Sequence, residues 1–118
     1  MKIANKLFVV AAAATLMATA SFASNADLVK EGEKVFNTKK IGNCLACHAV
    51  EGKKISNPGS LGPKLVGLAY WDEKDLYNIV YDPYATRSKI SAMPSFGKNG
   101  WLTHKQINAV VAYLKTIK

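Results

Sequence analysis

Apolar side chains recur at the spacing of one helix face in three stretches of the chain. The clearest stretch is 103–117, where apolar residues fall at i, i+3, i+4, i+7 and i+10: Ile107, Val110, Val111, Leu114 and Ile117. Just before them, Thr103 and Gln106 have the three-residue spacing of a capping box, in which each side chain bonds the other's backbone N–H. We therefore predict a C-terminal helix that begins near residue 103.

A second helical pattern covers residues 27–37. Its apolar residues fall at i, i+7 and i+8: Leu28, Val35 and Phe36. Gly32 lies on the same side, and a glycine inside a helix costs about 1 kcal/mol relative to alanine. This position indicates that another element crosses the helix closely, although a tolerated surface glycine is the alternative. We expect the crossing element to be the C-terminal helix, near Tyr113.

The third pattern is shorter and lies between two loops. Residues 72–81 have acidic side chains in the first turn, and the apolar pattern that follows stops at Asp82-Pro83. Glycine and proline interrupt any period in 51–67, and 84–100 is also irregular. A loop as long as 51–67 usually has a function or wraps around something. With no internal repeat, the 118 residues form one small domain.

The first 23 residues have the pattern of a secretory signal peptide. Lys2 and Lys6 precede the apolar run 7–18, and small residues follow at Ser21 and Ala23. We expect cleavage after residue 23, or after 26, and a mature domain of residues 24–118 exported to the periplasm. An uncleaved anchor is the alternative, but the strongly apolar part is shorter than the ~18 residues that a spanning helix needs.

The charge of the chain is strongly positive. The formal net charge is +8, and without the leader the chain has 14 basic and 8 acidic side chains, a net charge of +6. This balance favours anionic partners, and lysines such as Lys39, Lys40, Lys53 and Lys54 would steer them. Nucleic acid is a poor candidate, because no basic helix face is interleaved with aromatic residues.

A CxxCH motif, Cys44-Leu45-Ala46-Cys47-His48, follows the first predicted helix. This is the spacing for covalent haem attachment: each thiol adds to a vinyl group, and the imidazole reaches the iron. A zinc half-site would need more ligands, and only His104 follows. A thioredoxin-like dithiol would need a βαβ context, and a lone disulfide would not explain the adjacent histidine. We therefore predict one haem c, held by Cys44, Cys47 and His48.

The sixth coordination position of such an iron has two candidate ligands. Met93 is the only methionine after the leader, and it precedes a proline, which favours an extended conformation in a loop. His104 is the only other histidine, and it lies at the start of the last predicted helix. We favour His48 and Met93 as the axial ligands, with a bis-histidine pair or an open site as alternatives. A haem with both axial positions filled passes single electrons. Because both cysteines would be used to attach the haem, no free thiol would remain for sulfur chemistry.

The order of these features resembles the class I cytochromes c. The resemblance rests on the CxxCH motif between two helices, the turn Gly62-Pro63-Lys64-Leu65-Val66-Gly67, and the methionine loop before the last helix. It implies an all-α class I cytochrome c fold, in which the N- and C-terminal helices cross and loops wrap one covalent haem.

Within that superfamily the chain resembles the SoxX subunits of the sulfur-oxidising SoxAX cytochromes. The most specific stretch is 93–103, Met-Pro-Ser-Phe-Gly-Lys-Asn-Gly-Trp-Leu-Thr, and 42–48 and 58–63 also match. The resemblance implies a periplasmic heterodimer with a second haem protein, SoxA, which couples thiosulfate to a cysteine of the carrier protein SoxYZ. It implies that Cys44 and Cys47 attach the haem, and that His48 and Met93 are the proximal and distal ligands.

In such a complex this chain is the electron-transfer subunit of an L-cysteine S-thiosulfotransferase, and the catalytic haem lies on the partner. Two other functions stay open. One is a freely diffusing periplasmic cytochrome c that carries electrons between respiratory complexes, guided by its lysines. The other is a haem sensor that binds a small ligand at an open iron.

Overall fold

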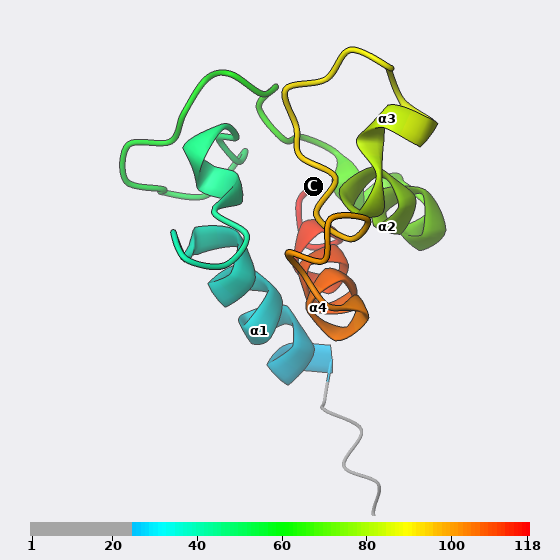
Figure 1. Ribbon diagram of the computed structural model, residues 1–118. Coiled ribbons are helices and arrows are strands. Elements are labelled where there is room, and N and C mark those ends of the chain that lie inside the picture. The colour runs from blue at the N-terminus through cyan, green and yellow to red at the C-terminus, as the bar shows by residue number, and fades with distance from the viewer. Residues whose placement is uncertain (1–24) are drawn as a thin grey trace, which may run out of the picture.

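The computed structural model describes residues 25–118, and the predicted signal peptide, residues 1–23, lies outside them. The described residues form four α-helices and two short 3₁₀ turns (Figure 1). Their bounds are α1 Asn25–Asn37, η1 Cys44–Ala46, η2 Leu68–Tyr70, α2 Glu73–Tyr81, α3 Pro83–Thr86 and α4 His104–Leu114. The only β feature within them is an isolated parallel bridge between Val50 and Leu65. The predicted all-α fold is confirmed.

Helices α1 and α4 cross at Gly32, as the sequence predicted. A Cβ atom at position 32 would overlap the carbonyl of Ala109 and lie 2.9 Å from the Cβ of Tyr113. One turn further along α1, the ring centroid of Phe36 lies 5.2 Å from that of Tyr113. The glycine therefore lets the two backbones approach, and the two aromatic rings fill the space beside the crossing.

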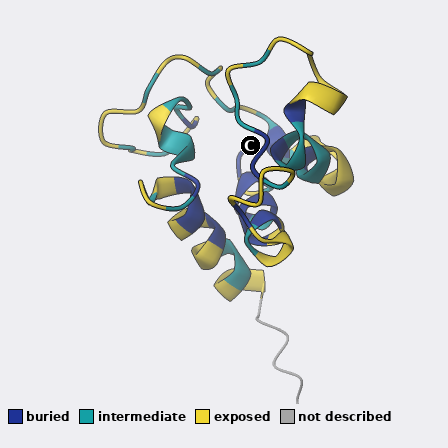
Figure 2. Ribbon diagram, viewed as in Figure 1, coloured by how far each residue is buried: buried dark blue, intermediate teal, exposed yellow. Residues whose placement is uncertain are grey.

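The core lies where α1, α2 and α4 meet, and Figure 2 shows the buried residues along the facing sides of these helices. Val35 and Phe36 come from α1, and Leu76 and Val80 come from α2. Helix α4 contributes its whole apolar stripe: Ile107, Ala109, Val110, Val111, Tyr113 and Leu114. The helical spacing in the sequence therefore identified the buried face of each helix.

The ends of the helices agree with the sequence in most details. The capping box at Thr103 and Gln106 is present in both directions, at 3.1 Å and 2.9 Å. Asp72 caps α2 by accepting a hydrogen bond from the backbone N–H of Lys74. The stretch after Asp82-Pro83 is less irregular than predicted, because Pro83 is suited to the first turn of a helix and begins α3.

Two further observations complete the fold. Ile117 lies beyond the end of α4 but is buried, and its carbonyl accepts a hydrogen bond from the N–H of Ala69 in η2. Within residues 25–118, every helix is too short or too polar to cross a bilayer.

Candidate functional site

The CxxCH motif forms a single tight turn at the end of α1. Gly42 donates its N–H to the carbonyl of Val35 in α1, and Asn43 has a left-handed backbone, φ 50°, that redirects the chain into η1. The N–H groups of Cys47 and His48 both donate to the carbonyl of Cys44, at 3.1 Å and 3.0 Å. The two thiols and the imidazole therefore belong to one compact turn, as the spacing predicted.

Both cysteines are free thiols of intermediate exposure. Burial raises the pKa of the Cys44 thiol from 9.0 to about 12, a hydrogen bond from its own backbone N–H opposes the shift, and the nearby Cys47 adds to it. Cys44 is therefore held as a neutral thiol against apolar side chains. This environment suits a sulfur atom that forms a thioether, because a thioether carries no charge.

The imidazole of His48 is held in one orientation by the turn at Gly62-Pro63. Its Nδ1 lies 2.7 Å from the carbonyl oxygen of Pro63. A carbonyl only accepts, so Nδ1 carries the proton and Nε2 keeps the lone pair that a metal needs. A Cβ atom at position 62 would lie 2.5 Å from Cε1 of His48, so glycine is required for the turn to pass under the ring. The Pro63 carbonyl is therefore the acceptor that fixes the tautomer of His48.

The loop 51–67 is fixed to the motif at several points. Gly59 donates its N–H to the carbonyl of Leu45 at 2.9 Å, and a Cβ atom there would overlap the carbonyl of Ala46. Gly62 donates to the carbonyl of Cys47 at 2.9 Å, and Leu65 donates to that of Ala49 at 2.8 Å. Two glycines thus allow the loop to lie directly against the motif backbone.

Met93 lies in the loop between α3 and α4, half-buried against the core. Its N–H donates to the hydroxyl of Ser91 at 3.1 Å. The loop is attached to the C-terminal end of α2, where the carbonyl of Tyr81 accepts hydrogen bonds from the N–H groups of Gly97 and Lys98, at 3.2 Å and 3.1 Å. His48 and Met93 are therefore held by separate segments, each with its own set of contacts.

Asp82, the next residue after α2, attaches the same loop through its side chain. Its carboxylate accepts a hydrogen bond from the hydroxyl of Ser95 at 3.0 Å and forms an ion pair with Lys98 at 3.6 Å. Partial burial alone would raise the pKa of Asp82, but the Ser95 and Lys98 contacts and a backbone N–H at Ala85 outweigh it, so the pKa is lowered. The sequence analysis missed this role, because Asp82 was assigned only as the end of a helix.

His104 is part of an aromatic stack on α2. Its ring is nearly parallel to the rings of Tyr77 and Tyr81, and its Nδ1 is hydrogen-bonded to the Tyr77 hydroxyl. The ring of Tyr81 leaves no room for a Cβ atom at Gly97. The spacing of Tyr77 and Tyr81, one helical turn apart, was the only sequence signal for this stack.

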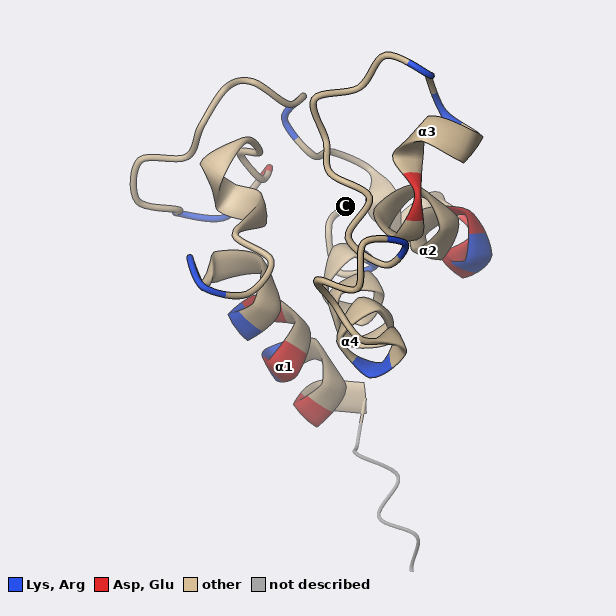
Figure 3. Cartoon of the chain, viewed as in Figure 1, with Lys and Arg blue, Asp and Glu red and all other residues tan. Residues whose placement is uncertain are grey.

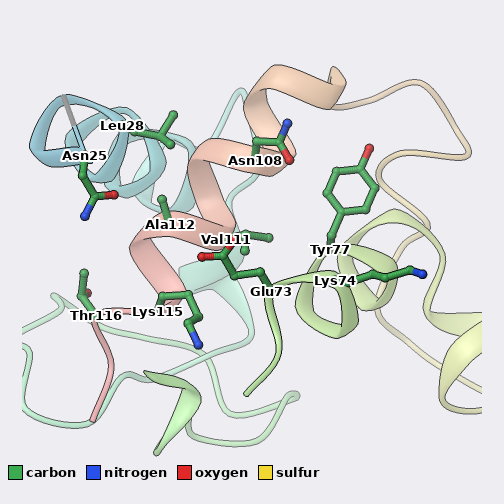
Figure 4. Close-up of a pocket in the computed structure, with 10 residues that line it drawn as sticks. All are labelled: Asn25, Leu28, Glu73, Lys74, Tyr77, Asn108, Val111, Ala112, Lys115 and Thr116. Atoms are coloured by element: carbon green, nitrogen blue, oxygen red, sulfur yellow. The ribbon is translucent and has the colours of Figure 1, made fainter. Parts of the chain in front are cut away.

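A cavity of about 580 Å³ lies elsewhere in the molecule, between α1, α2 and α4 (Figure 4). Its lining includes Leu28, Tyr77 and Val111, and none of the predicted haem ligands. The ammonium group of Lys115 at its edge already donates to the carbonyls of Ala69 and Trp71. The cavity is therefore not part of the candidate site.

Comparison with known proteins agrees with this geometry. The family model for cytochrome c matches residues 29–118. A chain in the crystal structure of SoxXA from P. pantotrophus is 30% identical, with a TM-score of 0.65, and the match covers 74% of this chain and 79% of that one. A protein of Aquifex aeolicus (strain VF5), described as an uncharacterized lipoprotein, is 38% identical over 92 residues. That match covers 74% of this chain but only 44% of the lipoprotein's length.

Proposed function

Because this chain belongs to the cytochrome c family, we propose that Cys44 and Cys47 attach one haem c and that His48 and Met93 ligate its iron. The chain is a SoxX-type member of that family, and such a haem supplies reversible one-electron chemistry. The observation that carries the ligand assignment is the geometry of His48. Its Nδ1–H is held by the Pro63 carbonyl, so its Nε2 is free to bind a metal.

The residues around the motif fit a haem. The Cys44 sulfur is in an apolar environment, and the glycines at 59 and 62 let the loop backbone lie against the motif without side chains in the way. Leu61, 74% exposed, lies in the same turn and offers apolar surface to a porphyrin ring. Met93 supports the sixth position, because its loop is fixed to α2 and its thioether is soft. Two filled axial positions would exclude other ligands.

Substitution of Met93 tests the ligand assignment. We expect Met93→Ala to abolish the weak near-infrared sulfur-to-iron absorption of the oxidised protein and to lower the reduction potential, because thioether ligation raises it. His104→Ala is the matched control, and it should keep the band. A band that survives in Met93→Ala, or disappears only in His104→Ala, would show that Met93 is not the ligand.

We further propose that the chain is the electron-transfer subunit of a periplasmic thiosulfate-oxidising complex. Its similarity to a SoxXA chain supports a SoxA-type partner, and a carrier protein of the SoxYZ type would be the substrate. Joining thiosulfate to a carrier cysteine forms one S–S bond and releases one proton and two electrons. Both cysteines of this chain are used for haem attachment, so the sulfur chemistry belongs to the partner and this chain accepts the electrons singly.

The native mass of the exported protein tests this assignment. Stable co-elution with a second haem protein, and reduction of the haem of this chain by thiosulfate plus carrier protein, are the expected results. A monomer with one haem that thiosulfate cannot reduce in the presence of the host's soluble fraction would instead support a mobile periplasmic electron carrier. The net charge of +6 after the leader is the observation that favours that second candidate.

A further inference from the structure

The positive charge of the molecule is concentrated in the last third of the chain. Residues 25–82 contain eight basic and eight acidic side chains, so their formal charges cancel. Residues 83–118 contain no acidic side chain and six basic ones: Arg87, Lys89, Lys98, Lys105, Lys115 and Lys118. Figure 3 shows blue but no red segments along the chain between α3 and the start of α4, and Asp82 is the last acidic residue in the sequence. Four of these six residues, Arg87, Lys89, Lys98 and Lys105, lie between the end of α3 and the first turn of α4, in or beside the loop that carries Met93.

Residues 98–105 combine exposed cations with an exposed aromatic side chain. We call this combination the Trp101 surface, and it is defined by four residues: Lys98, Trp101, His104 and Lys105. All four residues are exposed, and the exposed fraction of Trp101 is 60%. Lys105 forms no ion pair within residues 25–118, and Lys98 is paired only with Asp82. Tryptophan is enriched at protein interfaces, and exposed lysines beside it attract a partner of opposite charge.

The same surface is connected to the methionine loop by direct packing. The ring of Trp101 meets the ring of Phe96 edge-on, with centroids 6.1 Å apart. Phe96 is buried and lies three residues after Met93. A partner in contact with Trp101 would therefore lie against a ring that packs on Phe96, a member of the same core cluster against which Met93 packs.

From these observations we infer that the Trp101 surface is the docking site for an acidic protein that takes an electron from this cytochrome. The inference rests on the proposed electron-transfer function. In this step the reduced cytochrome is oxidised by one electron, the same electron reduces the partner's redox centre, and no bond is made or broken. The lysines at 39, 40, 53 and 54 form the competing surface. They are disfavoured because residues 39–54 contain no phenylalanine, tyrosine or tryptophan, and because the Lys53 ammonium already lies 4.2 Å from the buried Tyr113 ring centroid and donates to the Thr116 hydroxyl.

A titration of the reduced, isotope-labelled holoprotein with poly-L-glutamate locates the docking site. At low ionic strength, the backbone amide shifts are expected to cluster at residues 98–105 and to disappear at about 0.5 M salt, because exposed charges are screened. Shifts that cluster at residues 39–54, or that spread evenly over the exposed lysines, would overturn the inference.

Oxidation kinetics with two matched double variants provide the second measurement. Lys98→Gln/Lys105→Gln removes two charges from the Trp101 surface, and Lys30→Gln/Lys34→Gln removes two from exposed positions of α1. With ferricyanide, an anionic oxidant, the first variant should react roughly fivefold more slowly at low salt and the second much closer to wild type. A cationic cobalt(III) oxidant should show no such loss.

The two outcomes of the kinetics separate the inference from its premise. Equal slowing of both double variants by ferricyanide would show that only net charge matters, which overturns the docking site and leaves electron transfer intact. A holoprotein that neither oxidant oxidises would overturn the proposed function and the docking site together.

Discussion

The orientation of His48 is decided by contacts of a few atoms. The Pro63 carbonyl accepts the Nδ1 proton at 2.7 Å, and the absence of a side chain at Gly62 lets the turn approach the ring. When the ring nitrogen of a ligating histidine that does not bind the metal donates a hydrogen bond, the bond fixes the tautomer of the imidazole and raises its basicity. The electronic properties of the proposed iron site should therefore respond to position 62, where an added Cβ atom would lie 2.8 Å from Nδ1 and 2.9 Å from Nε2 of His48.

Gly62→Ala tests this dependence. The added methyl group would lie 2.5 Å from the ring, so we expect a shift of the reduction potential and a loss of roughly 1–3 kcal/mol in the free energy of unfolding. Both are measured on the holoprotein, by redox titration and by denaturant unfolding. Gly52→Ala is the control. Its φ of +73° also makes alanine unfavourable, but no atom lies within 4 Å of an added Cβ. In Gly52→Ala we therefore expect the free energy of unfolding to fall and the reduction potential to stay unchanged. If Gly62→Ala and Gly52→Ala had the same reduction potential, the orientation of His48 would not depend on position 62.

At the scale of elements, the C-terminal end of α2 fixes the methionine loop. The Tyr81 carbonyl and the Asp82 carboxylate together bind Ser95, Gly97 and Lys98. This arrangement connects a helix of the core to the segment that carries Met93. Because the pKa of Asp82 is lowered in the folded protein, the contact has a defined pH dependence.

The pH dependence follows from the direction of that shift. An aspartate has an ordinary pKa of about 3.9, and the folded protein holds Asp82 below it, so the unfolded chain binds more protons between the two values. The stabilisation from Asp82 is therefore fully present above pH 4 and is lost as the pH falls through the folded pKa. We expect Asp82→Asn to be less stable than wild type at pH 6, with the difference shrinking towards pH 2.

Unfolding of the holoprotein by denaturant at a series of pH values measures this difference. Asp75→Asn removes a carboxylate from an exposed position of the same helix and serves as the matched control. A difference between wild type and Asp82→Asn that stays constant from pH 6 to pH 2 would show that the carboxylate does not stabilise the loop.

For the molecule as a whole, a covalent haem would enlarge an apolar core that is small. The buried apolar residues come mainly from three helices, while the loops 51–67 and 87–103 are held largely by backbone hydrogen bonds and a few side-chain contacts. Chains of this size bury a limited fraction of their surface, and an apolar prosthetic group adds to the core. The loops should therefore depend on the haem more than the α1–α4 crossing does.

Removal of both attachment thiols tests that dependence. We expect the mature chain with Cys44→Ala/Cys47→Ala to be haem-free and to lack a sharp thermal unfolding transition, measured by circular dichroism. Ala46→Ser changes an exposed residue inside the same motif and should retain both haem and transition. A haem-free double variant that melts cooperatively, within a few degrees of the holoprotein, would show that the chain folds without the haem.

Local sequence patterns predicted much of this protein because their physical causes are local. The apolar stripe of α4, its capping box and the glycine at the α1–α4 crossing follow from helix periodicity and from backbone hydrogen bonding over a few residues. The CxxCH motif is also local, since two thiols and an imidazole on one turn need only the correct spacing. The resemblance to SoxX added the family, which the comparisons support.

Only the tertiary structure decided which distant residues support these local features. The Pro63 carbonyl meets His48 across 15 residues, and Asp82 meets Ser95 across 13, because the loops fold back onto the motif and onto α2. His104 stacks on two tyrosines 27 and 23 positions earlier in the chain for the same reason. The sequence by itself determined α1, α2 and α4, the haem motif and the family, but not the short helix α3. The packing of the loops decided how His48 is oriented, how the Met93 loop is held, and where the positive charge meets an exposed tryptophan.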